Sequence, residues 1–222
     1  MAMERAELLD NTYARDRAVM VARHLRARGI DDPLLLAAMG NVPRETFVPE
    51  HLQEFSYEDS ALPIEAGQTI SQPYIVALMT ELAEPAPGAK VIEVGTGSGY
   101  QAAVLAACGA EVWSIEIVEE LAARAQRDLA RLGVEHVHVR SGDGYRGWPE
   151  AAPFDAILVT AAAPRVPEAL LAQLRVGGRL VIPVGETGEL QSLEVHERGE
   201  DGFTVRHVTP VRFVPMTGEG VE

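Results

Sequence analysis

The chain has 222 residues, of which 47% are hydrophobic and 23% are charged, values typical of a globular protein and not of a disordered one. Its formal net charge of −14 and the lack of any Lys/Arg run argue against a nucleic-acid-binding surface. It has neither an 18-residue apolar run nor a secretory signal pattern, so we expect a cytoplasmic protein that does not bind a membrane.

The first elements are two predicted helices and a long irregular connection. Apolar residues at helical spacing predict a helix that Gly29 ends, and Asp32 is expected to cap a second helix that stops at Gly40. Residues 41–72 hold Pro, Gly and polar breaks with little periodicity. Long loops of this kind are often functional, so we expect this connection to contribute to a site.

A third helix is predicted after Ser71. Apolar residues recur at helical spacing from Ile75 to Leu82, and Pro73 suits the first turn. In one interpretation Ser71 is simply the N-cap of this helix. In the other, the hydroxyl and the free N–H groups of the helix N-terminus bind a carboxylate. The pattern alone leaves both open.

A glycine-rich loop follows the strand predicted from Lys90. Gly95, Gly97 and Gly99 alternate ahead of a helix predicted over residues 100–108. This layout brings backbone close to a nucleotide-bearing ligand, but Tyr100 stands where a dinucleotide fingerprint needs its third glycine. Glu93, just before the loop, disfavours a pyrophosphate and suits the cationic amino acid end of S-adenosylmethionine. The loop is similar to the E-x-G-x-G-x-G motif of methyltransferases that use this cofactor.

Two further acids end the next predicted strands. Glu116 closes strand 111–116 about 20 residues after the first glycine, the spacing at which an acid meets ribose hydroxyls. Asp143 follows strand 137–140 between two glycines, and we expect it to accept from the adenine amine. Ligands in parallel α/β sheets bind at the carboxyl ends of the strands, so these acids are predicted to meet at one site.

The remaining elements complete the predicted fold. Strand 154–160, helix 167–174 and strand 179–183 continue the alternation, and strands 190–198 and 203–210 then form an antiparallel hairpin. The fold class expected is therefore α/β, with a doubly wound, mostly parallel Rossmann-like sheet, an N-terminal helical lobe and a C-terminal antiparallel hairpin. We expect one domain over 1–222, divided into a lobe (1–66), a cofactor-binding core (67–185) and a hairpin with tail (186–222).

The metal-ligating residue types are sparse. The single cysteine, Cys108, excludes a disulfide and lies on an apolar helix face, where a buried and unreactive thiol is expected. His136 and His138 lie two residues apart without an evident third ligand, so a solvated strand face is the better interpretation. No metal is predicted.

Several segments resemble one known family. Gly67–Ala77, with Gln68-Thr69-Ile70-Ser71-Gln72-Pro73, is similar to the G-Q-T-I-S-x-P signature of the protein-L-isoaspartate O-methyltransferases. The resemblance extends over about residues 15–217 and includes five more segments, namely Pro43–Pro49, Glu93–Gln101, Gly142–Trp148, Pro153–Pro164 and Val211–Met216. It implies methyl transfer from S-adenosylmethionine, leaving S-adenosylhomocysteine, to the α-carboxylate of L-isoaspartyl residues and less well of D-aspartyl residues. The ester then closes to a succinimide, which begins the repair of the damaged protein.

The resemblance also implies site residues. Ser71 is expected to orient the acceptor carboxylate without attacking it, because that carboxylate is already ionised at neutral pH and needs no general base. The expected cofactor-binding residues are Gln68, Thr69, Ile70, Ser71, Glu93, Gly95, Thr96, Gly97, Ser98, Gly99, Glu116, Ile117, Asp143, Gly144 and Thr217. The expected partners are isoaspartyl peptides and proteins, and the enzyme is expected to act as a monomer.

Two other functions compete with this one. A methyltransferase acting on a small molecule or a nucleic acid would show the same loop and acids, and only residues 67–74 with their flanking segments separate the two. A nucleotide-sugar or dinucleotide-binding regulatory module is disfavoured by Tyr100 at the third glycine position.

Overall fold

The computed structural model describes residues 12–219, and the two ends of the expected domain, 1–11 and 220–222, lie outside the described residues. The chain is helical from residue 12 and continues through the π-helical turn η1 (Val21–Leu25) and the 3-10 turn η2 (Arg26–Arg28). Gly29, in the left-handed conformation, ends this segment as predicted. The next helix, α2 (Pro33–Asn41), begins at the predicted cap, where the Asp32 carboxylate accepts from the backbone N–H of Leu35 at 2.8 Å.

The irregular connection contains short 3-10 helices and a small hairpin. The 3-10 helices are η3 (Arg44–Phe47), η4 (Glu50–Phe55) and η5 (Glu65–Gly67). The hairpin pairs β1 (Leu62–Pro63) with β2 (Thr69–Ile70), and η5 forms its tip. Helix α3 (Pro73–Ala83) follows, but its N-cap is Gln72, with no side-chain capping bond. The capping interpretation of Ser71 is therefore wrong, because Ser71 lies one residue before the cap.

Seven strands form the main sheet of the described chain, in the order β5-β4-β3-β6-β7-β8-β9. Strands β3 to β7 are parallel to one another. Strands β8 and β9 add two antiparallel strands at one edge. The strands are β3 (Lys90–Val94), β4 (Glu111–Glu116), β5 (Val137–Ser141), β6 (Phe154–Val159), β7 (Leu174–Val184), β8 (Gln191–Arg198) and β9 (Phe203–Val211). This is the predicted doubly wound sheet with its C-terminal hairpin.

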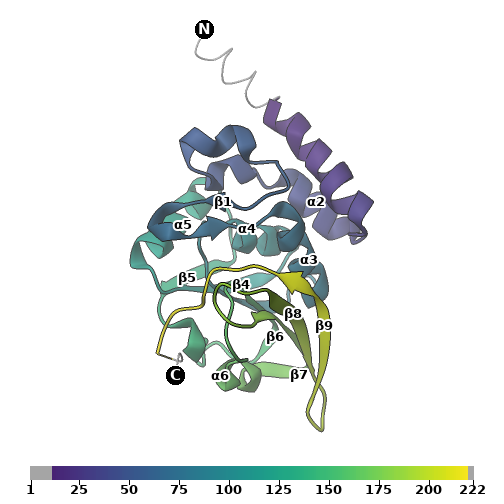
Figure 1. Cartoon of the computed structure of the whole chain (residues 1–222), viewed down its shortest axis with the longest axis vertical. Helices are drawn as coiled ribbons and strands as arrows, with labels where there is room; N and C mark the ends of the chain where they lie inside the picture. Colours follow the sequence, from purple (N-terminus) through teal and green to yellow (C-terminus); the bar gives the residue numbers. More distant parts are fainter. Residues whose placement is uncertain (1–11, 220–222) are drawn as a thin grey trace.

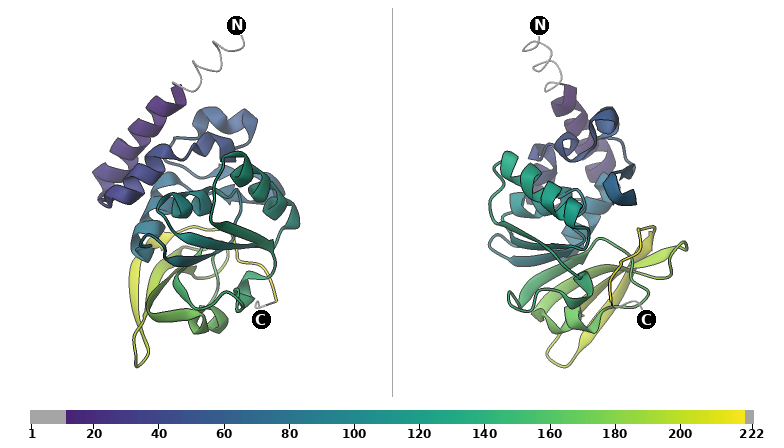
Figure 2. Two further views of the ribbon diagram at one scale, coloured as in Figure 1. Left: turned by 180° about the vertical axis from the view of Figure 1, so that it is seen from behind. Right: turned by 90° about the vertical axis from the view of Figure 1, so that its left-hand side faces the viewer.

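The helices between the strands cover both faces of this sheet (Figures 1 and 2). These are α4 (Tyr100–Ala107), α5 (Glu119–Arg131) and α6 (Glu168–Ala172). Alternate residues of the strands separate two cores: Val91 and Leu158 pack with α3 and α4, whereas Ile92 and Ile157 pack on the opposite face with α6. Such alternation follows from the two-residue period of a strand.

One helix is much shorter than predicted. The expected helix 167–174 gives only the five residues of α6, and Leu174 already belongs to an 11-residue β7 instead of the predicted strand 179–183. Leu174 is fully buried opposite Phe154 of β6. A Cβ at Gly178 would lie 2.8 Å from the Asp155 carbonyl oxygen, so glycine allows the close strand contact that extends β7.

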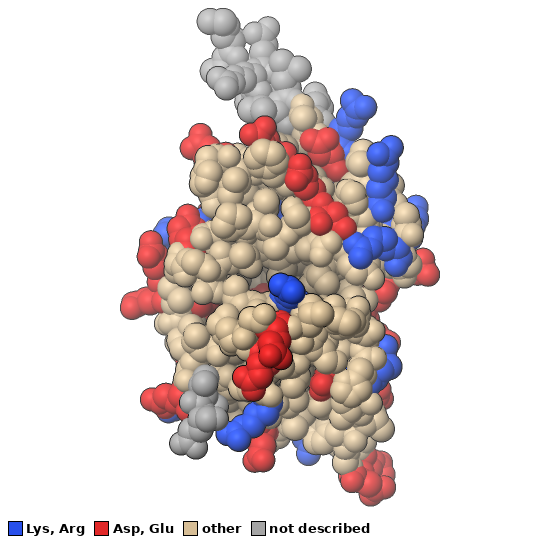
Figure 3. Space-filling model, in the orientation of Figure 1, with Lys and Arg blue, Asp and Glu red and all other residues tan. Residues whose placement is uncertain are grey.

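Charged side chains are scattered over the face drawn in Figure 3, where the largest group of Lys and Arg lies over the N-terminal helices. No helix within residues 12–219 is long and apolar enough to cross a membrane.

Candidate cofactor and acceptor site

A pocket opens at the carboxyl ends of β3, β4 and β6. The order in which the strands are added to the sheet reverses here, because β4 and β5 lie on one side of β3 whereas β6 lies on its other side. Ligands of doubly wound sheets bind at this topological switch point. The pocket has an empty volume of about 910 Å³, including its open mouth.

Most of the predicted site residues line this pocket. Those that do are Gln68, Thr69, Ile70, Ser71, Glu93, Gly95, Thr96, Gly97, Ser98, Glu116, Ile117, Gly144 and Thr217. Two predicted residues, Gly99 and Asp143, lie outside the lining. Gly99 instead packs against α5, where a Cβ would lie 3.2 Å from the Cβ of Ala125.

The glycine loop depends on its first glycine. Gly95 has φ +97°, a left-handed conformation that other residues rarely adopt. A Cβ there would lie 2.5 Å from the Thr160 hydroxyl, which donates to the Gly95 carbonyl at 2.6 Å. Thr160, which follows β6, therefore holds the loop directly against the end of that strand. A side chain at position 95 would displace the Thr160 hydroxyl.

Glu93 is a buried acid with one free oxygen. Oε2 accepts from the Ser114 hydroxyl at 2.5 Å, and that hydroxyl lies 2.5 Å from the Thr96 hydroxyl. Oε1 is buried without a hydrogen-bond partner among the described residues. Burial raises the pKa of Glu93 to about 8, opposed by the Ser114 hydrogen bond and assisted by repulsion from Glu116. A cationic group in the pocket would both bond to the free oxygen and favour the charged form.

Glu116 is held rigidly at the end of β4. Its Oε2 accepts from the backbone N–H of Gly97 at 2.8 Å, and its Oε1 accepts from that of Val118 at 2.9 Å. The residue is buried, yet it lines the pocket. Each carboxylate oxygen has two lone pairs, so both can still accept from a ligand. The geometry suits a pair of vicinal hydroxyls.

Asp143 is engaged by backbone. Oδ1 accepts from the Tyr145 N–H at 3.0 Å, and Oδ2 accepts from the Glu219 N–H at 2.9 Å. The carboxylate therefore ties the 3-10 helix η6 (Gly144–Arg146) to the C-terminal segment. The neighbouring Gly144 lines the pocket, but the structure does not place the Asp143 side chain there. The predicted acid is therefore at the expected strand end, but it lies outside the pocket lining.

Residues 68–71, which run through β2 of the hairpin toward α3, form another part of the pocket lining. Ser71 is half-buried between β2 and α3 and lines the pocket, and its hydroxyl makes no hydrogen bond to another described residue. The hairpin before it reaches over the glycine loop, since a Cβ at Gly97 would lie 3.9 Å from Ile64. The hairpin thus places a free hydroxyl and the glycine loop around one cavity.

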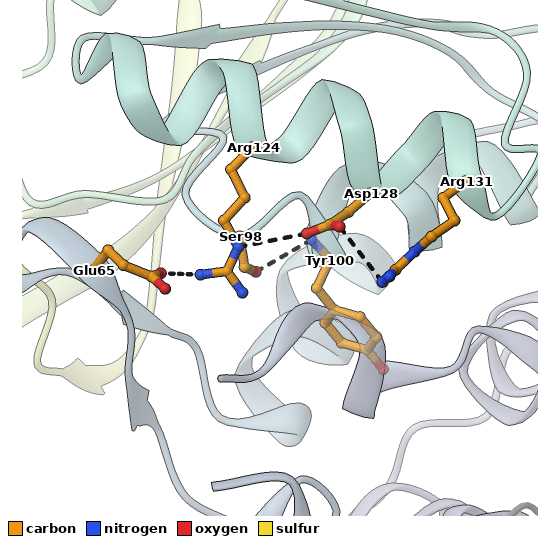
Figure 4. Close-up of polar contacts among 6 residues, drawn as sticks. All are labelled: Glu65, Ser98, Tyr100, Arg124, Asp128 and Arg131. Carbon is orange, nitrogen blue, oxygen red and sulfur yellow. Dashed lines mark hydrogen bonds and ion pairs between the residues drawn. The ribbon is translucent and has the colours of Figure 1, made fainter. Parts of the chain in front are cut away.

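An ion pair fastens the hairpin tip to α5. Glu65 pairs with Arg124, whose Nε lies 3.4 Å from Asp128 (Figure 4). The same view contains Tyr100, whose backbone N–H donates to the Ser98 hydroxyl at 3.3 Å. The hairpin tip is therefore tied to α5, whereas the Tyr100–Ser98 bond lies within the glycine loop and the start of α4.

Other lining residues were not predicted. Gln101 joins α4 to α3 through a 2.8 Å hydrogen bond to Thr80. Thr160 and the segment Val214–Met216 also line the pocket, and the segment is held by the Met216 N–H, which donates to the Ala162 carbonyl at 2.7 Å. Thr160 could have been found by applying the strand-end argument to β6. The contacts of residues 214–216 could not be predicted, because they depend on how the chain returns to the pocket after β9.

Among residues 12–219 no group of three or more His, Cys, Asp or Glu side chains is arranged to hold a metal ion. His138 lies on a half-exposed strand position, 3.4 Å from Glu111. The thiol of Cys108 is buried as predicted, and burial raises its pKa to about 12.

The pocket residues fit S-adenosylmethionine. The unpartnered oxygen of Glu93 suits the ammonium or sulfonium, and the fixed carboxylate of Glu116 suits the ribose. Ile117 and Met216 supply apolar surface for a base. These groups come from the end of β3, the end of β4 and the segment after β9, yet all line one cavity.

Comparison with known proteins identifies the family. The family model described as protein-L-isoaspartate(D-aspartate) O-methyltransferase matches residues 16–220. A protein-L-isoaspartate O-methyltransferase of Gloeobacter violaceus is 57% identical over 200 residues, which are 90% of this chain and 98% of that protein. One of Synechococcus sp. is 55% identical over 210 residues, covering 92% of this chain and 86% of that protein.

Solved structures agree with these relatives. A protein-L-isoaspartate O-methyltransferase superposes with a TM-score of 0.84 at 31% identity over 91% of this chain, which spans 66% of that protein. A Plasmodium falciparum protein described as such an enzyme, in complex with S-adenosyl-L-homocysteine, has a TM-score of 0.77 at 28% identity, over 89% of this chain and 96% of its own. By sequence and by fold, this chain belongs to the protein-L-isoaspartate(D-aspartate) O-methyltransferase family.

Proposed function

We propose that the protein transfers the methyl group of S-adenosylmethionine to the α-carboxylate of L-isoaspartyl residues, and less well of D-aspartyl residues, in damaged proteins. The ester forms as a carboxylate oxygen attacks the methyl carbon and the sulfur leaves as the thioether of S-adenosylhomocysteine. The ester later loses methanol as the neighbouring backbone nitrogen closes a succinimide, and hydrolysis of that ring restores some normal aspartate.

The observation that carries this proposal is that Ser71, whose hydroxyl has no hydrogen-bond partner among the described residues, lines the same cavity as Glu93 and Glu116. The acceptor needs no general base, because an α-carboxyl with a pKa near 3.5 is ionised at neutral pH. What the reaction requires is in-line placement of oxygen, methyl carbon and sulfur, and positioning of this kind supplies much of a rate enhancement.

Ser71 is the residue assigned to the acceptor. Its hydroxyl lies just before the N-terminus of α3, where backbone N–H groups lack intrahelical partners and the helix dipole favours an anion. Hydroxyl and N–H groups together orient the carboxylate, and no covalent enzyme intermediate is formed. The absence of a capping bond leaves this hydroxyl available to the substrate.

Cofactor binding is assigned to the pocket residues in three groups. Glu93 binds the amino acid end of the cofactor, and Glu116 binds its ribose. The loop from Gly95 to Gly99 lies along the part of the cofactor between them. Gln68, Thr69, Ile70, Ile117, Gly144 and Thr217 close around these parts. Asp143 serves the adenine amine once its bond to the C-terminal segment is exchanged. No metal is assigned a role.

We further propose a cytoplasmic monomer that acts on isoaspartyl peptides and proteins and binds neither nucleic acid nor membrane. Its single domain spans 1–222, with a helical and irregular lobe (1–66) before the cofactor-binding core (67–185) and the hairpin and tail (186–222) behind it. The acidic net charge of −14 supports the exclusion of nucleic acid.

The proposed chemistry is tested on an isoaspartyl hexapeptide with S-adenosylmethionine. Mass spectrometry should detect the methyl ester, then its succinimide with loss of methanol, and finally a mixture of aspartyl and isoaspartyl peptides. A protein that methylates RNA or a small metabolite but leaves this peptide unmodified would contradict the proposal and support a methyltransferase of another substrate class.

A further inference from the structure

Arg44 is a fully buried cation that the proposed chemistry does not use. It opens η3, and its side chain is 0% exposed, the largest of the fully buried side chains within the described chain. Arginine is almost never fully buried unless it is paired. A buried arginine is therefore expected to have a partner that compensates its charge.

The guanidinium bonds to two backbone carbonyls from separate segments. Nε donates to the Ser56 carbonyl at 2.7 Å, and Nη2 donates to the Ser71 carbonyl at 2.8 Å. Its Cζ lies 4.8 Å from the centre of the Tyr100 ring, at the start of the helix that follows the glycine loop. One side chain thus ties the acceptor serine to the cofactor side of the pocket.

The charge of Arg44 is not neutralised by an acid of the described chain. The nearby Glu45 is occupied, since Oε1 pairs with Arg17 at 3.3 Å and Oε2 accepts from the Tyr57 hydroxyl. Nη1 of Arg44 is buried and has no hydrogen-bond partner. Burial lowers the pKa of Arg44 to about 10, opposed by Tyr100 and Tyr57, so the group is still a cation at pH 7.

If Arg44 served only the stability of the fold, its buried and unpaired charge would be unfavourable. An unpaired buried charge and an unsatisfied buried donor both destabilise a fold, and an apolar side chain of similar volume would avoid both penalties. Local features that weaken a fold without an evident structural gain occur mostly at functional sites.

We propose that Arg44 is a positioning residue for the acceptor: it fixes the Ser71 carbonyl and supplies the uncompensated positive charge behind the carboxylate that Ser71 holds. This inference rests on the proposed carboxyl methylation. Arg44 touches neither the reacting atoms nor the cofactor. It acts through Ser71, and its field favours an anionic acceptor over a neutral one.

The test compares a charged acceptor with a neutral one. The two probes are an L-isoaspartyl hexapeptide and the same peptide with an α-carboxamide in place of the α-carboxylate, each titrated into the complex with S-adenosylhomocysteine. The wild-type protein should prefer the carboxylate at least about tenfold. Arg44→Met should shrink this preference about tenfold while S-adenosylhomocysteine affinity changes less than about twofold. A side chain that only supports the fold would weaken both peptides equally.

Arg17→Met is the matched control. It removes another arginine of the same lobe, one that contacts Glu45 and Tyr57 but not Ser71. The Arg17→Met variant should prefer the carboxylate peptide over the carboxamide peptide by the same factor as the wild-type protein. Arg44→Lys keeps the charge but cannot hold two carbonyls with a rigid fork, so it should keep most of the preference and lose about tenfold in kcat.

The outcomes separate the two claims. A wild-type protein that fails to methylate the isoaspartyl peptide would end the proposed function and this inference with it. An active wild-type protein whose preference survives in a folded Arg44→Met variant would overturn the role of Arg44 alone. If Arg44→Met does not fold, Arg44→Lys decides, and wild-type kcat in that variant would equally overturn the role.

Discussion

At the scale of single residues, the buried carboxyl of Glu93 couples cofactor binding to pH. Its raised pKa of about 8 means that it is mostly protonated at pH 7 before the cofactor binds. A cationic group at the free oxygen favours the charged form and lowers this pKa, so binding should release a proton. Affinity should therefore rise with pH up to about 8, by at most about tenfold per pH unit, and become constant above it.

Calorimetry of S-adenosylhomocysteine binding in buffers with different ionisation enthalpies measures this proton. Glu93→Gln is the control, because it removes the titrating carboxyl while the ammonium of the ligand titrates in both proteins. Equal proton release by wild type and Glu93→Gln would show that Glu93 does not take the amino acid end.

The rigid carboxylate of Glu116 gives a second prediction. Glu116→Ala leaves two ligand hydroxyls without their acceptor and should weaken S-adenosylhomocysteine binding by about 1–3 kcal/mol. Glu111→Ala, at the half-exposed start of the same strand, is the control and should bind like the wild type. Unchanged affinity in the Glu116 variant would refute the ribose assignment.

Ser71 and Asp32 form a contrasting pair. The Ser71 hydroxyl has no capping bond, whereas Asp32 caps α2 through the Leu35 N–H. Ser71→Ala should therefore slow methylation with little change in melting temperature. Asp32→Ala should cost about 1 kcal/mol of stability and keep the turnover of the folded protein. A Ser71→Ala variant with wild-type kcat and KM would sink the acceptor role.

At the scale of elements, the turn after β3 depends on Gly95. Gly95→Ala must adopt a strained φ and also overlap the Thr160 hydroxyl. Gly88→Ala, at φ +79° with nothing within 4 Å, carries only the first penalty, about 1–2 kcal/mol. Denaturant unfolding should find Gly95→Ala clearly less stable than Gly88→Ala, with weakened cofactor binding. Equal stability of the two variants would mean that the loop does not need this contact.

Sequence patterns predicted the elements that local chemistry specifies. The strands β3 and β4, the Asp32 cap and the glycine loop were all predicted at their observed places. The hairpin 62–70 was not, because two-residue strands carry no periodic signal. The end of α6 was misplaced because pairing between Leu174 and Phe154, a tertiary contact, overrides the local helical pattern.

The site, like the fold, was predicted from the sequence only in part. The resemblance supplied the acceptor segment, and the strand-end argument placed Glu93 and Glu116 correctly on the pocket. Neither could tell that both oxygens of Asp143 bond to backbone, since one of those bonds comes from Glu219, 76 residues away in sequence. The burial of Arg44 could not be predicted either, because it arises only when the segments around Ser56, Ser71 and Tyr100 meet.

At the scale of the whole molecule, the pocket is lined by two parts of the chain. The ends of the parallel strands contribute the residues that we propose for the cofactor, and residues 68–71, which run through β2 of the hairpin toward α3, contribute those that we propose for the acceptor. The strands around β3 pair in continuous register, whereas the acceptor side depends on short 3-10 turns. In the proposed function, the sheet therefore fixes the geometry of the cofactor, and the short segments before α3 determine the choice of acceptor.

Acceptor choice is the central claim, because isoaspartyl and aspartyl linkages carry the same charge and differ only in the place of one methylene. Apolar contacts would separate them by only about 1–3 kcal/mol. A carboxylate fixed by hydrogen bonds at Ser71 does better, since in the wrong isomer the oxygen misses the in-line position and the donors are unmatched.

The most direct measurement is therefore kcat/KM for transfer of labelled methyl from S-adenosylmethionine to two hexapeptides that differ only in this linkage. We predict methylation of the isoaspartyl peptide with at least about a thousandfold preference over the aspartyl peptide, because loss of matched hydrogen bonds discriminates far more strongly than apolar contact. Equal methylation of the two peptides would contradict the account.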